Sequence, residues 1–477
     1  TSQNQVLQHA IDEPPVTDSA ATPEITVTPL DAPSPDPIGL LPPDVTGLPR
    51  SLWSASDQDT VVALVQAERS ESLPAIQDFL TTLMLAEADP PLGAGIDGAL
   101  FLARVDKLLD FGAIEQAQAL LEQADPEEPA LFRRWFDVAL LTGSEDRACD
   151  VMQTNPQLAP TFSARIFCLA RSGDWNTAAL TLNTHRVLGD MTAEEEELLT
   201  RFLDPELFEG EDKMPAPARV SPLIFRMREA VGEGLPTRSL PRAFAHADLR
   251  DTVGWKSQLE AAERLVRNGA LSANALLGLY TERKPAASGG VWERVRAVQN
   301  IEAALVKPDP ERLSQALQDA HYQMADYGLT PALAEIYAPE IAELELTAAG
   351  DAMRFMLTLM SDAYETARVD PAQESVHTRF MQSLAAGTPE GAEALNYPLA
   401  EAIEEGFDTG VPDEELAALM AEGKLGEAIL LAAEQMTSGL NGNMGALKSG
   451  IAAMRQMGLE DITRRASLQM MLKKPRD

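Results

Sequence analysis

The residues of this chain that could carry out chemistry are few, and their spacing matches no common catalytic motif. Residues 93–98 fit the G-x-G-x-x-G pattern of dinucleotide sites, but a segment containing Pro90 and Pro91 precedes them instead of the required β-strand. We therefore predict a loop there, with no cofactor, no metal ion and no catalytic residue. The five histidines lie far apart and never at metal-ligand spacing: His9, His185, His246, His321 and His377.

One run of carboxylates, residues 194–197, could be mistaken for a glycosidase pair or a calcium loop. Consecutive glutamates are more typical of the first turn of a solvated helix, where negative charge is favoured by the helix dipole. A calcium loop would also need ligands at alternating positions. We predict a helix start and no ion site.

The two cysteines are the residues with the clearest chemical potential, because they could form a disulfide. Cys149 and Cys168 lie on either side of an expected loop at residues 155–160, whose centre falls within one residue of the midpoint between them. Antiparallel helices flanking that loop would hold the two thiols at the same height. A disulfide there would contribute about 3 kcal/mol and indicate an oxidising compartment. The alternative is two buried free thiols that act as small apolar residues.

The sequence around these cysteines contains an internal repeat. Three segments align on a glycine, with spacings of 31 and 30 residues. In each segment a Phe lies 11 positions before the Gly, an Ala lies 5 positions after it, and apolar residues recur 7, 4 and 3 positions before it. Those offsets trace one face of a helix. The aligned residues are Phe101, Gly112 and Ala117; Phe132, Gly143 and Ala148; and Phe162, Gly173 and Ala178.

This internal repeat predicts stacked helix pairs. The Gly supplies a turn after the first helix, the small Ala lets the second helix approach closely, and the Phe fills the core. A fourth copy is predicted around Gly423, where Pro412 replaces the leading Phe at a helix start. A single helix pair leaves one apolar face exposed to water, and stacking a second pair on that face buries it. We predict an all-α fold, an α-solenoid of stacked antiparallel helix pairs.

The segment from Arg171 to Ala178 resembles tetratricopeptide-type repeats, because a helix, a Gly-Asp turn and a helix with Ala follow in order. The period is shorter than that family's, which is about 34 residues, and the Trp-Leu-Gly-Tyr signature of its first helices is missing. The resemblance implies helix-turn-helix architecture. It transfers no functional residue.

Composition divides the chain into four predicted regions. The first 50 residues hold ten prolines and seven acidic residues, too little apolar surface to offset the entropy of ordering. We predict a disordered, acidic, Pro-rich tether at residues 1–46 and a helical-repeat array at 47–210. A Pro-rich break follows, then a middle helical region at 211–346 and a C-terminal helical region at 347–477.

The net charge of −36 excludes several partners. It repels phosphate backbones and anionic lipid surfaces, so we expect no nucleic acid partner. No stretch reaches the roughly 18 consecutive apolar residues of a membrane span, so we expect no direct membrane insertion. The charge either keeps the chain soluble or steers it toward a basic protein.

The expected function is non-catalytic. The sequence starts at Thr1 without Met, which, together with the tether and the cysteine pair, favours a periplasmic chain whose signal peptide has been removed. The layout is similar to uncharacterised envelope proteins of alphaproteobacteria, and loosely to periplasmic flagellar-motor accessory proteins. We predict a scaffold or adaptor that binds a protein or peptide and could belong to a larger envelope assembly. The alternatives are a flagellar-motor accessory protein and a superhelical enzyme of the lytic-transglycosylase type.

Overall fold

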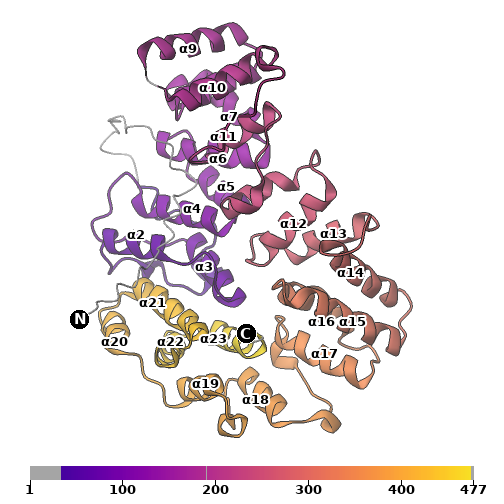
Figure 1. Cartoon of the computed structure of the whole chain (residues 1–477). Coiled ribbons are helices and arrows are strands. Elements are labelled where there is room, and N and C mark those ends of the chain that lie inside the picture. Colours follow the sequence, from indigo (N-terminus) through magenta and orange to yellow (C-terminus); the bar gives the residue numbers. More distant parts are fainter. Residues whose placement is uncertain (1–33, 190, 474–477) are drawn as a thin grey trace, which may run out of the picture. The chain divides into compact units, whose positions relative to one another are not determined.

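A computed structural model describes residues 34–189 and 191–473 of this chain (Figure 1). Helices joined by turns and loops make up these residues, and no β-strand occurs among them, which confirms the predicted all-α fold. In the same residues no helix is both long enough and apolar enough to cross a membrane. The chain forms two compact units. Unit 1 is Asp125–Pro236, and it interrupts unit 2, which comprises residues 34–124 and 237–473.

Unit 1 is built from six α-helices and two short 3-10 helices. In chain order they are α6 (Pro129–Thr142), α7 (Glu145–Thr154), η2 (Pro156–Leu158), α8 (Phe162–Arg171), α9 (Trp175–Leu188), α10 (Ala193–Leu203), η3 (Pro205–Phe208) and α11 (Pro222–Ala230).

The first part of unit 2 contains α1 (Pro43–Thr46), η1 (Arg50–Leu52), α2 (Gln58–Ala67), α3 (Pro74–Leu85), α4 (Ala99–Phe111) and α5 (Ile114–Gln123). Its second part contains η4 (Thr237–Ser239), η5 (Arg242–Leu249), α12 (Trp255–Val266), α13 (Ala273–Glu282), α14 (Val291–Leu305), α15 (Pro310–Ala325), α16 (Thr330–Ile341), α17 (Ala348–Leu359), η6 (Tyr364–Thr366), η7 (Pro371–Gln373), α18 (Val376–Ala385), η8 (Ala392–Leu395), α19 (Pro398–Asp408), α20 (Glu414–Ala421), α21 (Leu425–Ser438), η9 (Gly439–Asn441), α22 (Met444–Gln456) and α23 (Glu460–Leu472). The predicted regional boundaries at 210 and 346 stay predictions.

The four glycines on which the sequence segments align all end a helix. Each has a positive φ, which glycine adopts without the steric cost borne by other residues. The small residue five positions later is fully buried in every case. The glycines and their φ values are Gly112 at 82°, Gly143 at 82°, Gly173 at 86° and Gly423 at 73°, and the buried residues are Ala117, Ala148, Ala178 and Ala428.

The phenylalanine prediction is right for two of the three segments. Phe101 and Phe132 are fully buried, but Phe162 is 46% exposed. The reason is helix register: Phe101 and Phe132 lie inside the first turn of α4 and α6, whereas Phe162 is the first residue of α8. Its ring instead stacks on the imidazole of His185, with the ring centroids 3.5 Å apart.

The predicted disulfide is present in unit 1. The Cys149 and Cys168 sulfurs are 2.01 Å apart and join α7 to α8 across the loop that contains η2. Both cysteines are buried. The bridge therefore closes the helix pair at the position that the spacing of the two residues indicates.

The prediction of disorder through residue 46 is wrong for its last part; residues 1–33 lie outside the described range. Residues 34–46 are folded against α4 of unit 2. The Asp36 carboxylate is buried and accepts a hydrogen bond from the Phe101 backbone N–H at 2.8 Å. The backbone carbonyls of Asp36 and Ile38 also accept hydrogen bonds from the buried guanidinium of Arg104. These few buried hydrogen bonds thus order a Pro-rich segment for which composition alone predicts disorder.

Unit 2 contains contacts between its first and last helices. The solenoid arrangement stays a prediction. In an open solenoid each helix pair contacts only its neighbours in the chain. In unit 2, however, α3 packs against α23, and α2 packs against α21. The Ala75 backbone N–H donates to the Gln469 side chain at 2.9 Å, and the hydroxyls of Ser72 and Thr437 are 2.9 Å apart. We call this set of contacts the closure of unit 2.

Gly426 on α21 lies at the closure, where it faces the buried Trp53. A Cβ added at Gly426 would lie 2.2 Å from the Trp53 ring and 3.0 Å from the Leu52 carbonyl oxygen. We expect Gly426→Ala to lower the free energy of unfolding by about 1–3 kcal/mol through overpacking, measured by chemical denaturation.

Gly278 in α13 is the matched control for that substitution. A Cβ there meets nothing within 4 Å, so Gly278→Ala should raise stability by up to about 1 kcal/mol through helix propensity. Equal effects of the two substitutions would show that the close approach of Gly426 and Trp53 does not stabilise the closure.

Candidate functional site

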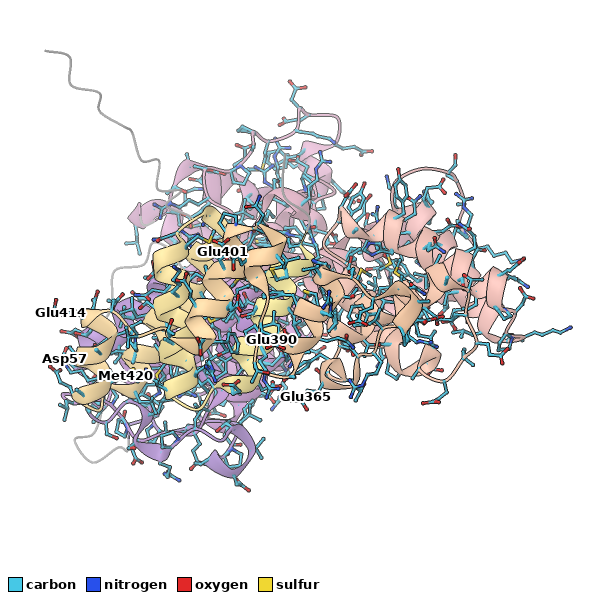
Figure 2. The ribbon with its side chains drawn as sticks, turned by 90° about the horizontal axis from the view of Figure 1, so that it is seen from below. Asp57, Glu365, Glu390, Glu401, Glu414 and Met420 are labelled. Carbon is cyan, nitrogen blue, oxygen red and sulfur yellow. A yellow bond between two sulfur atoms is a disulfide. The ribbon has the colours of Figure 1, made fainter. Side chains whose placement is uncertain are left out.

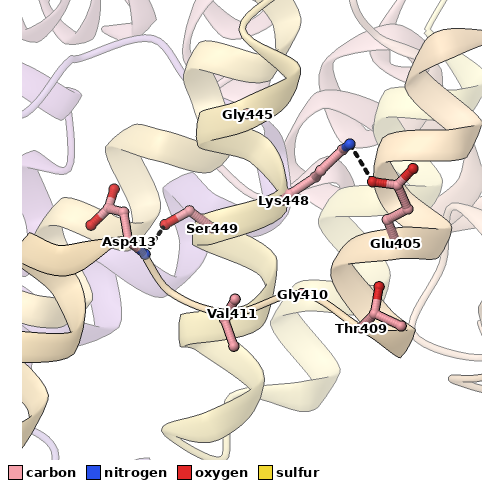
Figure 3. A pocket seen from close by; sticks show the side chains of 8 residues that line it. All are labelled: Glu405, Thr409, Gly410, Val411, Asp413, Gly445, Lys448 and Ser449. Atoms are coloured by element: carbon pink, nitrogen blue, oxygen red, sulfur yellow. Dashed lines mark hydrogen bonds and ion pairs between the residues drawn. The ribbon is translucent and has the colours of Figure 1, made fainter.

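A shallow pocket lies in unit 2 between α19, α22 and the segment that leads into α20 (Figure 3). Its volume is about 350 Å³, and it is open to solvent. One apolar side chain, Val411, is 75% exposed beside it. The lining residues are Glu405, Thr409, Gly410, Val411, Asp413, Gly445, Lys448 and Ser449.

The charged and polar groups of this pocket are held by contacts within the chain. Lys448 forms an ion pair with Glu405, and the Asp413 backbone N–H donates to the Ser449 hydroxyl at 2.9 Å. The Asp413 carboxylate accepts from the Leu416 backbone N–H, which caps α20, and from the Gln435 amide at 2.5 Å. These side chains fix helix ends to one another.

A second shallow pocket, of about 370 Å³, lies in unit 1 beside the disulfide. Cys168 contributes to its wall together with Arg165 and Asp174. The Asp174 carboxylate accepts from the Thr177 backbone N–H and so caps α9. Among residues 34–189 and 191–473, no group of three or more His, Cys, Asp or Glu side chains is placed to hold a metal ion.

A buried ion pair lies in the core of unit 2. The Glu263 carboxylate on α12 accepts two hydrogen bonds from Arg294 on α14, at 2.7 and 2.6 Å, and one from the Tyr280 hydroxyl at 2.7 Å. Burial, then the neighbouring Glu263 charge, raises the pKa of Tyr280 well above its ordinary value. The phenol therefore stays a hydrogen-bond donor at neutral pH. With all three groups satisfied by one another, the cluster holds three helices together.

Two of the residues that line the first pocket, Glu405 and Asp413, belong to a strongly acidic stretch of the chain. The stretch from Glu390 to Glu422 contains ten acidic residues and no basic one. We call the exposed carboxylates on this side of unit 2 the acidic face: Asp57, Glu365, Glu390, Glu401 and Glu414. Figure 2 shows these five on the side of the molecule that is turned toward the viewer. The negative potential of such a surface attracts cationic segments and repels anionic ones.

The acidic face was not among the residues that the sequence singles out. The predicted site residues are the two cysteines and the aligned Phe, Gly and Ala positions, which lie in unit 1 and in α4 and α5. For Glu390, Glu401 and Glu414 the signal was the run from Glu390 to Glu422 without a lysine or arginine, which is inconspicuous in a chain of net charge −36; Asp57 and Glu365 lie outside that run.

A separate acidic group lies where several helices of unit 2 approach one another. Asp78 on α3 and Glu335 on α16 are solvent-exposed, as is Asp362, which follows α17. The Asp78 side chain reaches solvent, but protein surrounds most of its carboxyl group. This desolvation, together with the nearby charges of Glu335 and Asp362, raises the pKa of Asp78 to about 6, although Arg465 on α23 opposes the shift. Arg465 also pairs with Asp362 at 2.9 Å.

We expect Asp78 to make unit 2 less stable as the pH rises. Because the folded pKa is raised, the folded state binds this proton more tightly than the unfolded state between about pH 4 and pH 6. Its stabilising effect is complete below the unfolded pKa and is lost as the pH rises through about 6. Asp78→Asn should therefore raise the melting temperature at pH 8 and flatten its dependence between pH 5 and pH 7.

The control for that measurement is Asp251→Asn, in an exposed loop of the same unit. It removes one exposed carboxyl from the same unit and so controls for the loss of a charge in itself. A wild-type melting temperature that rises with pH across this window, and an unaltered profile in Asp78→Asn, would contradict the assignment.

Comparison with known proteins gives no relative from which a function could be transferred. No protein-family model, no curated protein and no solved structure matches this chain. The functional argument therefore rests on the chemistry of the described residues.

Proposed function

We propose that this protein is a non-catalytic helical scaffold or adaptor of the periplasm, and that it binds a protein partner through the acidic face of unit 2. The observation that carries the proposal is the stretch from Glu390 to Glu422, which contains ten acidic residues and no basic one and includes Glu405 and Asp413 of the open pocket. The disulfide in unit 1 supports the choice of an oxidising compartment.

The partner is expected to present a segment rich in Lys or Arg. Glu401 and Glu414 lie in the first turns of α19 and α20 and are exposed, so a basic side chain could approach either without displacing a cation of the chain. Exposed Val411 adds an apolar contact between them along the chain. Exposed ion pairs are individually worth only about 0.2–1 kcal/mol, so several together would supply specificity and a fast, salt-dependent association.

A crosslinking experiment tests this proposal. A photoreactive amino acid at position 415, next to Glu414, is activated in the native cell, and the crosslinked proteins are identified by mass spectrometry. The expected product is one predominant protein with a basic segment at the crosslink. The double variant Glu401→Lys, Glu414→Lys should lose this product, because the acidic face is then partly reversed.

The matched control is Glu343→Lys, Glu345→Lys. Both glutamates are exposed in unit 2 and lie outside the acidic face, so the net charge changes equally. Thermal unfolding of both double variants verifies that they fold. If both double variants lose the crosslink, the change in overall charge is the cause and not the acidic face. If both double variants keep it, the acidic face is not the binding surface.

A further inference from the structure

The closure of unit 2 joins helices that are also packed on other parts of the unit. On one side of the closure α2 and α3 both pack on α4, and on the other side α21 and α23 both pack on α22. The polar contacts that cross it include the Ser72–Thr437 hydroxyl pair and the hydrogen bond from the Ala75 backbone N–H to Gln469. The two sides can therefore separate locally while the rest of unit 2 stays folded.

One buried polar group at the closure has no hydrogen-bond partner. The Trp53 side chain faces Gly426 of α21 and is only 1% exposed. Its indole Nε1–H is buried, and no acceptor for it occurs in the described part of the chain. A buried donor without an acceptor costs stability, because the same group would bond with water if it were exposed. The closed arrangement thus gives up a hydrogen bond that an open arrangement regains.

Two glutamates lie on opposite sides of the closure. Glu68 follows the last residue of α2 and is half-buried, whereas Glu434 lies on α21 and is exposed. The cations that act on the Glu68 carboxyl are Lys107 of α4 and the adjacent Arg69. Lys107 is also engaged elsewhere, because its Nζ donates to the Glu68 backbone carbonyl at 2.8 Å and pairs with Asp110 at 3.2 Å. A negative charge on Glu68 is therefore only partly compensated.

The Glu68 carboxyl holds its proton more tightly in the closed arrangement than in an open one. Desolvation, followed by the Glu434 charge, raises the pKa of Glu68 to about 7, and Lys107 and Arg69 oppose the shift. In an open arrangement water surrounds the carboxyl and α21 carries Glu434 away, so the pKa falls toward the ordinary value for glutamate. The proton therefore stabilises the closure fully below about pH 4.5, and this contribution is lost as the pH rises through about 7.

A second carboxyl, that of Asp78, lies where α3 packs on α23. The charged groups that act on it are Arg465 of α23, Glu335 of α16 and Asp362, which follows α17. Its pKa is raised to about 6, so its proton also stabilises unit 2 in acid and is lost as the pH rises. Both helices on this side of the closure thus gain negative charge over the same pH range.

We propose that the closure of unit 2 is a pH-sensitive switch, which holds α2 and α3 against α21 and α23 in mildly acidic conditions and releases them as the pH rises above neutral. In the closed arrangement, ionised Glu68 lies near Glu434 and within poorly solvated surroundings. Opening returns its carboxylate to water and gives the Trp53 N–H a partner. The switch belongs to helices that join distant parts of unit 2, and it does not depend on the acidic face or on its partner.

Hydrogen exchange at the Ala75 backbone amide reports the closure directly. Ala75 is the second residue of α3, so its N–H has no acceptor within the helix, and its bond to Gln469 crosses the closure. After correction for the intrinsic exchange rate at each pH, opening at Ala75 should increase about tenfold between pH 6 and pH 8.5. The amides of α14, in the same unit, should keep their protection. An opening at Ala75 that does not depend on pH would overturn the proposal, as would an equal loss of protection in α14.

Two substitutions test the carboxyls. Glu68→Gln resembles the protonated acid and cannot ionise, so Ala75 should stay protected at pH 8.5. Glu434→Gln removes the opposing charge and should reduce opening at pH 8.5 by a smaller factor. Glu343→Gln is the matched control, since Glu343 is exposed in unit 2 away from the closure, and it should keep the wild-type profile. Thermal unfolding at pH 6 verifies that each variant is folded. A Glu68→Gln protein that opens with pH as the wild type does would refute the switch.

Discussion

Replacing Arg104 with Met should lower the free energy of unfolding of unit 2 by more than about 3 kcal/mol. The Arg104 guanidinium is fully buried and donates to four backbone carbonyls. Its acceptors are Met84 O at 2.8 Å, Ala86 O at 2.9 Å, Asp36 O at 3.1 Å and Ile38 O at 2.9 Å. Met fills a similar volume but leaves all four carbonyls without this donor.

Arg104 stays positively charged at neutral pH. Burial lowers the pKa of Arg104 to about 10, and the nearby Asp36 carboxylate opposes that shift. The side chain is therefore still a cation at pH 7. Arg104→Lys should be intermediate in stability, because an ammonium group cannot reach four carbonyls as a planar guanidinium does.

Chemical denaturation measures the loss, and hydrogen exchange locates it. The backbone N–H groups of Leu40 and Leu41 both donate to Leu85 O, so their protection should fall most in Arg104→Met. Arg312→Met, at an exposed position on α15, is the control and should change stability by about 0.5 kcal/mol or less. Similar losses in the two variants would refute the role given to the buried guanidinium.

Phe132→Ala should lower the free energy of unfolding of unit 1 by about 3–5 kcal/mol, the range for a fully buried aromatic ring. The Phe132 ring contacts Trp135 edge to face, with centroids 5.8 Å apart, and stacks with Phe136 at 6.4 Å. Removing it leaves a cavity among large rings that cannot easily collapse.

Phe162→Ala is the comparison within the same unit, at the equivalent position of the next aligned segment. With 46% of Phe162 already exposed, its loss should cost about 1 kcal/mol or less, chiefly through the contact with His185. Urea denaturation of both variants, with the disulfide intact, measures the difference. Equal losses would mean that exposure does not distinguish the two phenylalanines.

These two phenylalanines also show how far the sequence could predict the fold. The glycine turns, the buried alanines and the cysteine pair follow from local spacing, because each depends on residues within one helix pair. The exposure of Phe162 depends on where α8 begins, and an 11-residue offset from Gly173 does not encode that start. Local periodicity identifies a helix face more reliably than it identifies a helix end.

Features that join distant parts of the chain could not be predicted in this way. Arg104 lies in α4, but its acceptors belong to α3, to Ala86 just after α3 and to the segment at residues 36–38. The closure between Ala75 and Gln469 spans most of the chain. The acidic face was visible as composition, but the pocket beside it requires α19 and α22 to pack together. Single-sequence patterns do not report such pairings.

The interruption of unit 2 by unit 1 has a consequence for the order of events at the ribosome. Unit 1 is continuous from Asp125 to Pro236, so its core can form as soon as that stretch has emerged. Unit 2 is complete only when α23 has been made, because α2 and α3 pack on α4 early but also on α21 and α23. The sides of α2 and α3 that face α21 and α23 therefore stay uncovered throughout most of synthesis, and we expect chaperones to act on this early segment more than on the later helices.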